Sequence, residues 1–121
     1  MPKKDPKSLG ERGEQLAAEY LQKKRYRIRE RNFRWARGEI DIVAQKDELL
    51  VFVEVKTARS DAFGEPETWV DERKQRQIAR VAERYLQEQA ISDMDCRFDV
   101  VAVKAQGNQW TIRHIENAFW L

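Results

Sequence analysis

The sequence has little cysteine, little net charge and no long apolar segment, and each of these absences excludes a class of protein. Its single cysteine, Cys96, excludes an internal disulfide framework and fits a reducing cytosol. Because Cys96 precedes an apolar run, we expect it to be a small buried residue. No run approaches the roughly 20 residues of a membrane span, and the N-terminal residues lack the apolar core of a signal peptide. We therefore expect a soluble, cytoplasmic protein without a membrane partner.

The sequence also lacks repeats, low-complexity segments and an interior linker. Its 121 residues are 41% hydrophobic and 36% charged, which suits one compact domain with a densely charged surface. Residues 1–8 are polar and contain two prolines, so we expect a flexible lead-in. Residues 9–121 are expected to form a single domain.

The positive charge is concentrated in one stretch. The net charge of +2 is too small to indicate a polyanionic partner by itself, but residues 23–37 contain eight basic residues and one acidic residue. This stretch is either a solvated face or a surface for a phosphate backbone. If it binds nucleic acid, Trp35 could stack on an unpaired base, although it could equally be a packing residue. The candidates for phosphate contact within it are Arg31, Arg34 and Arg37.

The pattern of apolar residues predicts an α/β protein with a mixed sheet and the element order α-β-β-β-α-β-β. Ser8, with Glu11 three residues later, indicates a capping box before a helix over 9–24. Strands are expected at 26–33, 38–45, 48–57, 97–104 and 110–115, and the second and third form a hairpin. A second helix is expected over 71–89.

The third strand contains two charges where apolar side chains would be expected. It reads VFVEVK over 51–56, and residues two apart project from the same face, so Glu54 and Lys56 point together. The valines of this run are then expected on the opposite, buried side. In the preceding strand, Ile40 and Ile42 alternate with acidic residues, so the hairpin could bring Asp41 near Glu54.

Two close carboxylates repel each other unless a cation lies between them. Mg²⁺ prefers oxygen ligands and accepts one or two carboxylates together with waters and phosphate oxygens. A site of this kind can activate water and neutralise charge on a phosphodiester, and Lys56 could orient the water or stabilise the phosphorus. The alternative is a Glu–Lys ladder on a half-exposed sheet. The residues alone leave both interpretations open.

Several longer motifs resemble one known family. GEIDIVAQ, VFVEVKT, FGEPETWVDERKQRQIARVAERYL and RFDVVAV resemble the bacterial YraN family of uncharacterised, endonuclease-like proteins. GERGEQLAAEYL and RNFRWARGEID are similar to the opening helix and first strands of that family, so the resemblance covers about residues 9–103. The family in turn resembles the restriction-endonuclease-like superfamily, with a central mixed sheet flanked by helices. It is especially similar to archaeal Holliday-junction resolvases.

The resemblance implies roles for five residues. Asp41 and Glu54 correspond to metal ligands, the backbone carbonyl of Val55 to a further ligand, and Lys56 to the catalytic lysine. Glu14 fits the carboxylate that the resolvases add from their first helix. The implied cofactor is Mg²⁺ or Mn²⁺ and the implied partner is DNA. The superfamily's proline before the aspartate is replaced here by Ile40. Resolvases of similar build act as symmetric dimers, which implies a homodimer.

Three further residues could contact phosphate, although each could also belong to a solvated face. They are Arg59, Lys74 and Gln77. We interpret His114 as structural, and Trp69, Trp110 and Trp120 as residues of the core or of an interface.

Three functions are compatible with these patterns. The first is a metal-dependent nuclease that hydrolyses DNA phosphodiesters, with branched or otherwise structured DNA as a candidate substrate. The second is a non-catalytic nucleic-acid-binding module of the same fold. The third is a protein–protein adaptor that uses exposed tryptophan and an acidic helix.

Overall fold

The computed structural model describes residues 8–59, 64 and 69–119, and the order of its elements confirms the predicted α-β-β-β-α-β-β arrangement. The expected lead-in (apart from Ser8), most of the loop after the third strand, and Trp120 lie outside the described residues. The elements are α1 (Leu9–Lys23), β1 (Arg27–Trp35), β2 (Gly38–Lys46), β3 (Leu49–Arg59), α2 (Glu72–Glu88), β4 (Asp95–Gln106) and β5 (Gln109–Ile115).

Both helices begin at side-chain caps. The hydroxyl of Ser8 accepts a hydrogen bond from the backbone N–H of Glu11, and the Glu11 side chain accepts one from the N–H of Ser8, so the predicted capping box is confirmed. Asp71 caps α2 by accepting a hydrogen bond from the N–H of Lys74. The buried face of α2 consists of Ile78, Val81, Ala82 and Tyr85.

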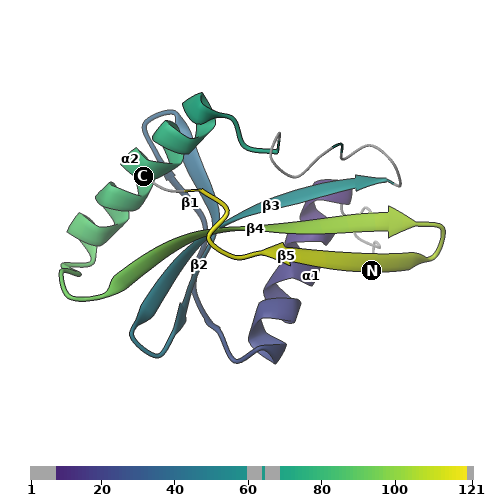
Figure 1. Cartoon of the computed structure of the whole chain (residues 1–121), viewed down its shortest axis with the longest axis horizontal. Helices are drawn as coiled ribbons and strands as arrows, with labels where there is room; N and C mark the ends of the chain where they lie inside the picture. Colours follow the sequence, from purple (N-terminus) through teal and green to yellow (C-terminus); the bar gives the residue numbers. More distant parts are fainter. Residues whose placement is uncertain (1–7, 60–63, 65–68, 120–121) are drawn as a thin grey trace, which may run out of the picture.

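The five strands form one mixed sheet in the order β1-β2-β3-β4-β5. Strands β3 and β4 are parallel, and the other neighbouring pairs are antiparallel. Because parallel neighbours need a crossover, α2 lies between them in the sequence and covers one face of the sheet. Helix α1 covers the other face (Figure 1).

Strand β3 is buried on both faces, whereas the sequence placed only its valines in the core. Val51 and Val53 pack with α1, and Leu50 and Phe52 pack on the other face with α2. A strand covered on both sides carries a nearly continuous apolar run. A charged side chain in this strand is therefore surrounded by protein. Glu54 is buried, so it does not belong to a Glu–Lys ladder on a half-exposed face.

Strands β1 and β2 are irregular at two points: their register shifts between Ile28 and Glu30, and the alternation of faces breaks around Asp41. Ile40 packs with the α2-side core and Ile42 with the α1-side core, so the expected common face of these two residues is wrong. In the register of β1 and β2, Asn32 is the residue opposite Asp41, and Asn32 has a positive φ of 55°. The pairing of β2 with β3 ends nearby, at Ile42 and Val53, and the two strands then diverge (Figure 1).

Two other expectations concern Cys96 and His114. Cys96 is exposed, so its expected burial is wrong; it lies at the start of β4, before the strand enters the core. The ring of His114 is buried, and its Nε2 lies 2.7 Å from the fully buried carboxylate of Asp99. Asp99 also accepts hydrogen bonds from Arg97 and from the backbone N–H of Asn117. This network ties β4 to β5, which fits a structural role for His114.

Within the described part of the chain, neither helix is long and apolar enough to cross a membrane.

Candidate metal and nucleic-acid site

Asp41 lies where β2 leaves β3. Its Oδ2 accepts a hydrogen bond of 2.8 Å from the backbone N–H of Val55, which continues the β2–β3 connection after the regular pairing has ended. The carboxylate therefore lies in the plane of the sheet, between β2 and β3, rather than above or below it. Asp41 is 9% exposed. The break in the alternation of β2 around Asp41 thus places its carboxylate in the gap between β2 and β3.

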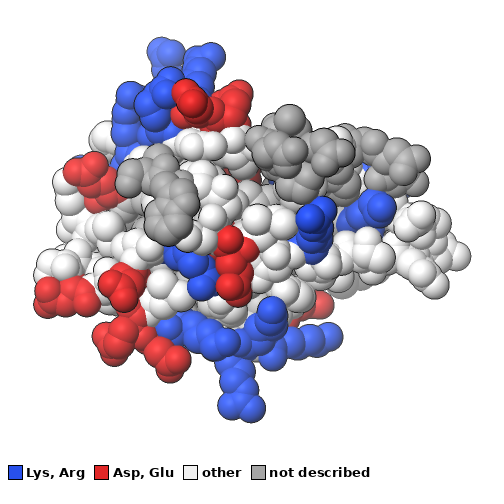
Figure 2. Space-filling model, viewed as in Figure 1, with Lys and Arg blue, Asp and Glu red and all other residues white. Residues whose placement is uncertain are grey.

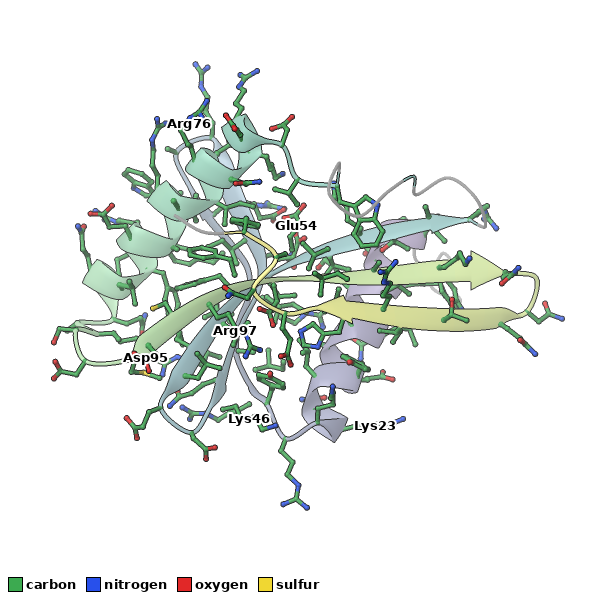
Figure 3. All side chains as sticks on the ribbon, viewed as in Figure 1. Lys23, Lys46, Glu54, Arg76, Asp95 and Arg97 are labelled. Atoms are coloured by element: carbon green, nitrogen blue, oxygen red, sulfur yellow. The ribbon has the colours of Figure 1, made fainter. Side chains whose placement is uncertain are left out.

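Glu54 reaches the same gap from β3. It is 8% exposed and points toward α2, where Lys74 Nζ lies 3.8 Å from its Oε2. Figure 3 shows the labelled Glu54 near the middle of the sheet, beneath the end of α2 that carries Arg76. Lys74 was expected either to face the site, where it could touch phosphate, or to belong to a solvated face; it faces the site, and contact with phosphate stays a prediction.

The two acids influence each other's charge. Burial, followed by the negative charge of Glu54, raises the pKa of Asp41 to about 7, and the hydrogen bond from Val55 opposes this shift. Burial also raises the pKa of Glu54, against the opposing effect of the positive charges on Lys74 and Lys56. The pair therefore holds a proton more tightly than ordinary carboxylates, and a divalent cation could replace that proton.

Glu14 approaches Asp41 from α1, and its negative charge contributes to the raised pKa of Asp41. Its Oε1 accepts a hydrogen bond of 2.9 Å from Asn32 Nδ2 and lies 4.0 Å from Arg31. Helix α1 comes this close because its neighbouring residue is Gly13, where a Cβ would overlap the side chain of Thr57 in β3. The helix carboxylate is thus beside the gap but is held by β1.

The carboxylate oxygens of Asp41 and Glu54 are suitable ligands for Mg²⁺, but they do not form a complete protein cage around an ion. Among the described residues, no three His, Cys, Asp or Glu side chains are arranged as a metal site. Mg²⁺ requires no such cage, because it usually keeps several waters and takes one or two carboxylates. The N–H of Val55 points toward β2, and the carbonyl of a strand residue points to the same side. The carbonyl of Val55 therefore faces the gap as well.

The basic residues of the stretch 23–37 do not form one stripe. Strand β1 runs from Arg27, opposite Gln45, to Trp35, opposite Gly38, which separates the two ends of the stretch by roughly 26 Å. Figure 2 shows Lys and Arg side chains gathered at two opposite sides of the molecule. The second end lies beside the start of α2, where Gln77 donates to the carbonyl of Arg37, whereas Arg29, near the first end, donates to Tyr85 further along the same helix.

The predicted nucleic-acid residues are accordingly dispersed. Arg31 donates to Gln15 on α1, and Arg34 donates to Glu39 at 2.7 Å. Arg59 is exposed at the end of β3. Gln77 donates to the backbone carbonyl of Arg37 at 2.9 Å. Trp35 is 39% exposed and is the large hydrophobic side chain most open to solvent among those described.

Sequence reasoning missed three arginines on α2. Together with Trp35, Arg37 and Gln77 they line a hollow of about 450 Å³ between α2 and the β1–β2 turn. Their spacing on the helix could have shown that they share a face with Gln77, but not that this face meets the turn. They are Arg73, Arg76 and Arg80.

Comparison with known sequences decides the family. Residues 13–103 match the profile of "Uncharacterised protein family UPF0102". The chain belongs to the UPF0102 family. This is the YraN family, so the resemblance inferred from the motifs is confirmed.

The UPF0102 relatives cover nearly the whole chain. A UPF0102 protein of Geobacter metallireducens is 50% identical over 115 residues, which is 95% of this chain and 94% of the relative. A second, from Alkaliphilus oremlandii, is 47% identical over 93% of this chain and 98% of the relative. A third, from Prosthecochloris aestuarii, is 44% identical over 95% of each. The names of these relatives state membership of the family and no activity.

Proposed function

We propose that this UPF0102 protein is a metal-dependent nuclease that hydrolyses phosphodiester bonds, with DNA as the substrate. The observation that carries the proposal is the pair of buried acids, Asp41 and Glu54, whose pKa values are raised at the point where two core strands separate. Burying two carboxylates costs stability unless a cation joins them. A Mg²⁺ or Mn²⁺ ion bound there would supply a Lewis acid for the phosphate and acidify a bound water.

The side chains around the acids have complementary tasks. Asp41 and Glu54 would hold the ion, and the carbonyl of Val55 would complete the protein's share of ligands. Lys56, two residues after Glu54 on β3, would stabilise negative charge that develops on the phosphate oxygens. Glu14 would reach the attacking water from the α1 side. Hydrolysis then adds water across one P–O bond, giving a phosphate and a hydroxyl end.

The experiment is a substrate panel at fixed ionic strength. Labelled duplex, flap, fork, four-way junction and single-stranded DNA, with matched RNA, are incubated with Mg²⁺, with Mn²⁺ or with EDTA. Wild-type protein should cleave at least one substrate in the presence of metal only. Lys56→Ala should lower the rate by roughly 100-fold or more, and Lys46→Ala, at the far end of the sheet, should leave it unchanged. Cleavage that survives Lys56→Ala would contradict the proposal.

One observation favours a second function, a nucleic-acid-binding module without catalysis. The carboxylate of Glu14 is held by Asn32 and Arg31, so it needs to change partners before it can join the two inner acids. This alternative predicts binding that is indifferent to divalent ions and no cleavage anywhere in the panel. The same assay, read alongside a binding measurement, separates the two functions.

A homodimer remains part of the proposal, because two symmetry-related sites would let one complex cut paired strands. Light scattering after gel filtration, with and without DNA, measures it. A mass of twice 14.4 kDa supports the paired arrangement, and a monomer in both conditions overturns it.

A further inference from the structure

A hollow of about 450 Å³ lies between the β1–β2 turn and the first turns of α2. Its volume falls in the range of about 300 to 1,000 Å³ that is typical of small-molecule sites. None of the described residues that line it is acidic. We call it the arginine hollow, and its polar and aromatic walls are Trp35, Arg37, Arg73, Arg76, Gln77 and Arg80.

The hollow is held in shape by close packing and by a hydrogen bond. A Cβ at Gly38 would meet Val81 Cγ2 at 2.5 Å, so only glycine lets the turn approach α2 this closely. Gln77 then ties the two walls together through the carbonyl of Arg37. Arg73, Arg76 and Arg80 project from one side of α2 because they are three and four residues apart.

The charge in the hollow is incompletely balanced. Four guanidinium groups line it, and Arg76 lies 3.9 Å from Glu72, whose side chain is 91% exposed. An exposed ion pair of this kind contributes little. Figure 2 shows the resulting gathering of basic side chains at the start of α2, with acidic ones beside it. Grouped arginines of this kind are suited to phosphate, which accepts paired hydrogen bonds from each guanidinium.

The aromatic side chain of the hollow, Trp35, indicates a second feature of the ligand. The ring of Trp35 is 39% exposed, and the guanidinium of Arg84 lies 5.7 Å from its centroid. An indole ring beside arginines fits a ligand with a flat base attached to a phosphate. A phosphate alone would use the arginines and leave the exposed part of the Trp35 ring in water.

The hollow adjoins the acidic pair through α2. Lys74, which contacts Glu54, follows Arg73 directly and precedes Gln77 by one turn. At 1.5 Å of rise per residue, Gln77 and Arg80 lie only about 4.5 and 9 Å further along the helix axis. A strand whose phosphate lies over Glu54 can therefore place a neighbouring nucleotide in the hollow.

We propose that the arginine hollow binds an unpaired nucleotide of the substrate strand, next to the phosphate held at Asp41 and Glu54. Arg73 and Arg76 hold its phosphate and Trp35 stacks on its base. A base in a continuous duplex is stacked and paired, so the substrate class is nucleic acid with an unpaired strand beside the cut. The inference takes from the proposed function only the position of the reacting phosphate.

The test is equilibrium binding by fluorescence anisotropy in EDTA, so that it does not depend on cleavage. The probes are a blunt duplex, the same duplex with a 5′ or a 3′ single-stranded tail, and a mononucleotide. Wild-type protein should bind one tailed duplex at least about tenfold more tightly than the blunt one. Trp35→Ala should weaken binding of that tailed duplex by roughly 5- to 150-fold, the equivalent of one lost stacking contact.

The double variant Arg73→Ala/Arg76→Ala should also lose the preference for the tail. It should reduce the slope of log affinity against log salt by about 1.4, the value for two contacts to single-strand phosphates. The matched control is Lys23→Ala/Lys46→Ala, which removes the same charge on the side of the molecule away from Arg76 (Figure 3). It should retain the preference for the tail. Circular dichroism establishes that each variant is folded at the assay temperature.

Three results overturn the inference: equal binding of blunt and tailed duplex by the wild type, an equal loss for both probes in the arginine variant, or a mononucleotide that binds as tightly as the tailed duplex. These outcomes are distinct from failure of the proposed function. A tail preference that depends on Trp35, in a protein that cleaves nothing in the panel, would support the hollow and overturn the nuclease.

Discussion

The backbone N–H of Val55 donates a 2.8 Å hydrogen bond to the carboxylate of Asp41, in the place where β2 and β3 cease to pair. This bond fixes the carboxylate through the backbone, independently of any neighbouring side chain. It occupies one lone pair of Oδ2, so the remaining lone pairs of the carboxylate are available to a cation. The backbone of the sheet thus holds the Asp41 carboxylate in the gap between β2 and β3 before any cation binds.

Removing one inner charge should stabilise the metal-free protein. Asp41→Asn keeps a carbonyl oxygen that can accept from Val55 but ends the repulsion with Glu54. We expect the free energy of unfolding at pH 8 in EDTA to rise by about 1 kcal/mol or more. Urea unfolding measures it, with Glu48→Gln at the exposed β2–β3 turn as the control. A destabilised Asp41→Asn protein would contradict the account of a strained acidic pair.

The stability of the metal-free protein should fall as the pH rises from about 5 to 8. The pKa of Asp41 is about 7 in the folded protein and 3.8 as an isolated group, so the folded state binds more protons between these values. Stability from this group is therefore complete below about pH 4 and is lost through pH 7. Glu54 shifts in the same direction.

Urea unfolding at several pH values in EDTA checks this dependence. The difference between wild type and Asp41→Asn isolates the contribution of the aspartate from that of the other carboxylates. That difference should grow between pH 5 and pH 8. A constant difference across this interval would show that Asp41 ionises normally in the folded state.

The approach of α1 to β3 should depend on one glycine. A Cβ at Gly13 would overlap Thr57, and its distance to the Thr57 Cβ is 2.7 Å, so a change of the threonine rotamer cannot relieve the overlap. We expect Gly13→Ala to lower the free energy of unfolding by about 1–3 kcal/mol. In the same helix, Gly10→Ala meets nothing within 4 Å and should stabilise by up to about 1 kcal/mol. Similar effects of the two substitutions would argue against the observed packing of α1.

The network of Asp99 should be structural rather than catalytic. Asp99 is fully buried and accepts hydrogen bonds from Arg97 and Asn117, and His114 lies 2.7 Å away. Because Asp99→Ala leaves buried polar groups unpaired, it should cost about 3–5 kcal/mol of stability. Asp95→Ala, at the exposed start of the same strand, should stay within about 0.5 kcal/mol. Below its melting temperature, the Asp99 variant should still bind Mn²⁺ as tightly as the wild type.

The sequence alone was sufficient to predict the helices, the strands and the two buried acids, because these predictions depend on local patterns. Period-2 and period-3.6 spacing located the strands and helices, and a capping box located the start of α1. Glu54 could be singled out because a charge inside a strand of valines is costly unless it has a partner. The hairpin then pointed to Asp41.

What the sequence could not show depends on long-range packing. The contact of Lys74 with Glu54 requires the crossover that lays α2 over β3. The arginine hollow requires α2 to meet the β1–β2 turn at Gly38, which are about 40 residues apart in the chain. Ile40 and Ile42 pack on different faces of the sheet because the alternation of β2 breaks around Asp41, and an alternating residue pattern does not reveal this break.

The most direct test of the acidic gap is Mn²⁺ binding at pH 8, followed by the loss of the free-ion signal in electron paramagnetic resonance. The wild type should bind one Mn²⁺ per chain, and Glu48→Gln should match it. Asp41→Asn and Glu54→Gln should each weaken binding by about tenfold or more, although both remain folded. Wild-type protein that leaves millimolar Mn²⁺ free, or an Asp41→Asn protein that binds it equally well, would contradict a cation site between Asp41 and Glu54.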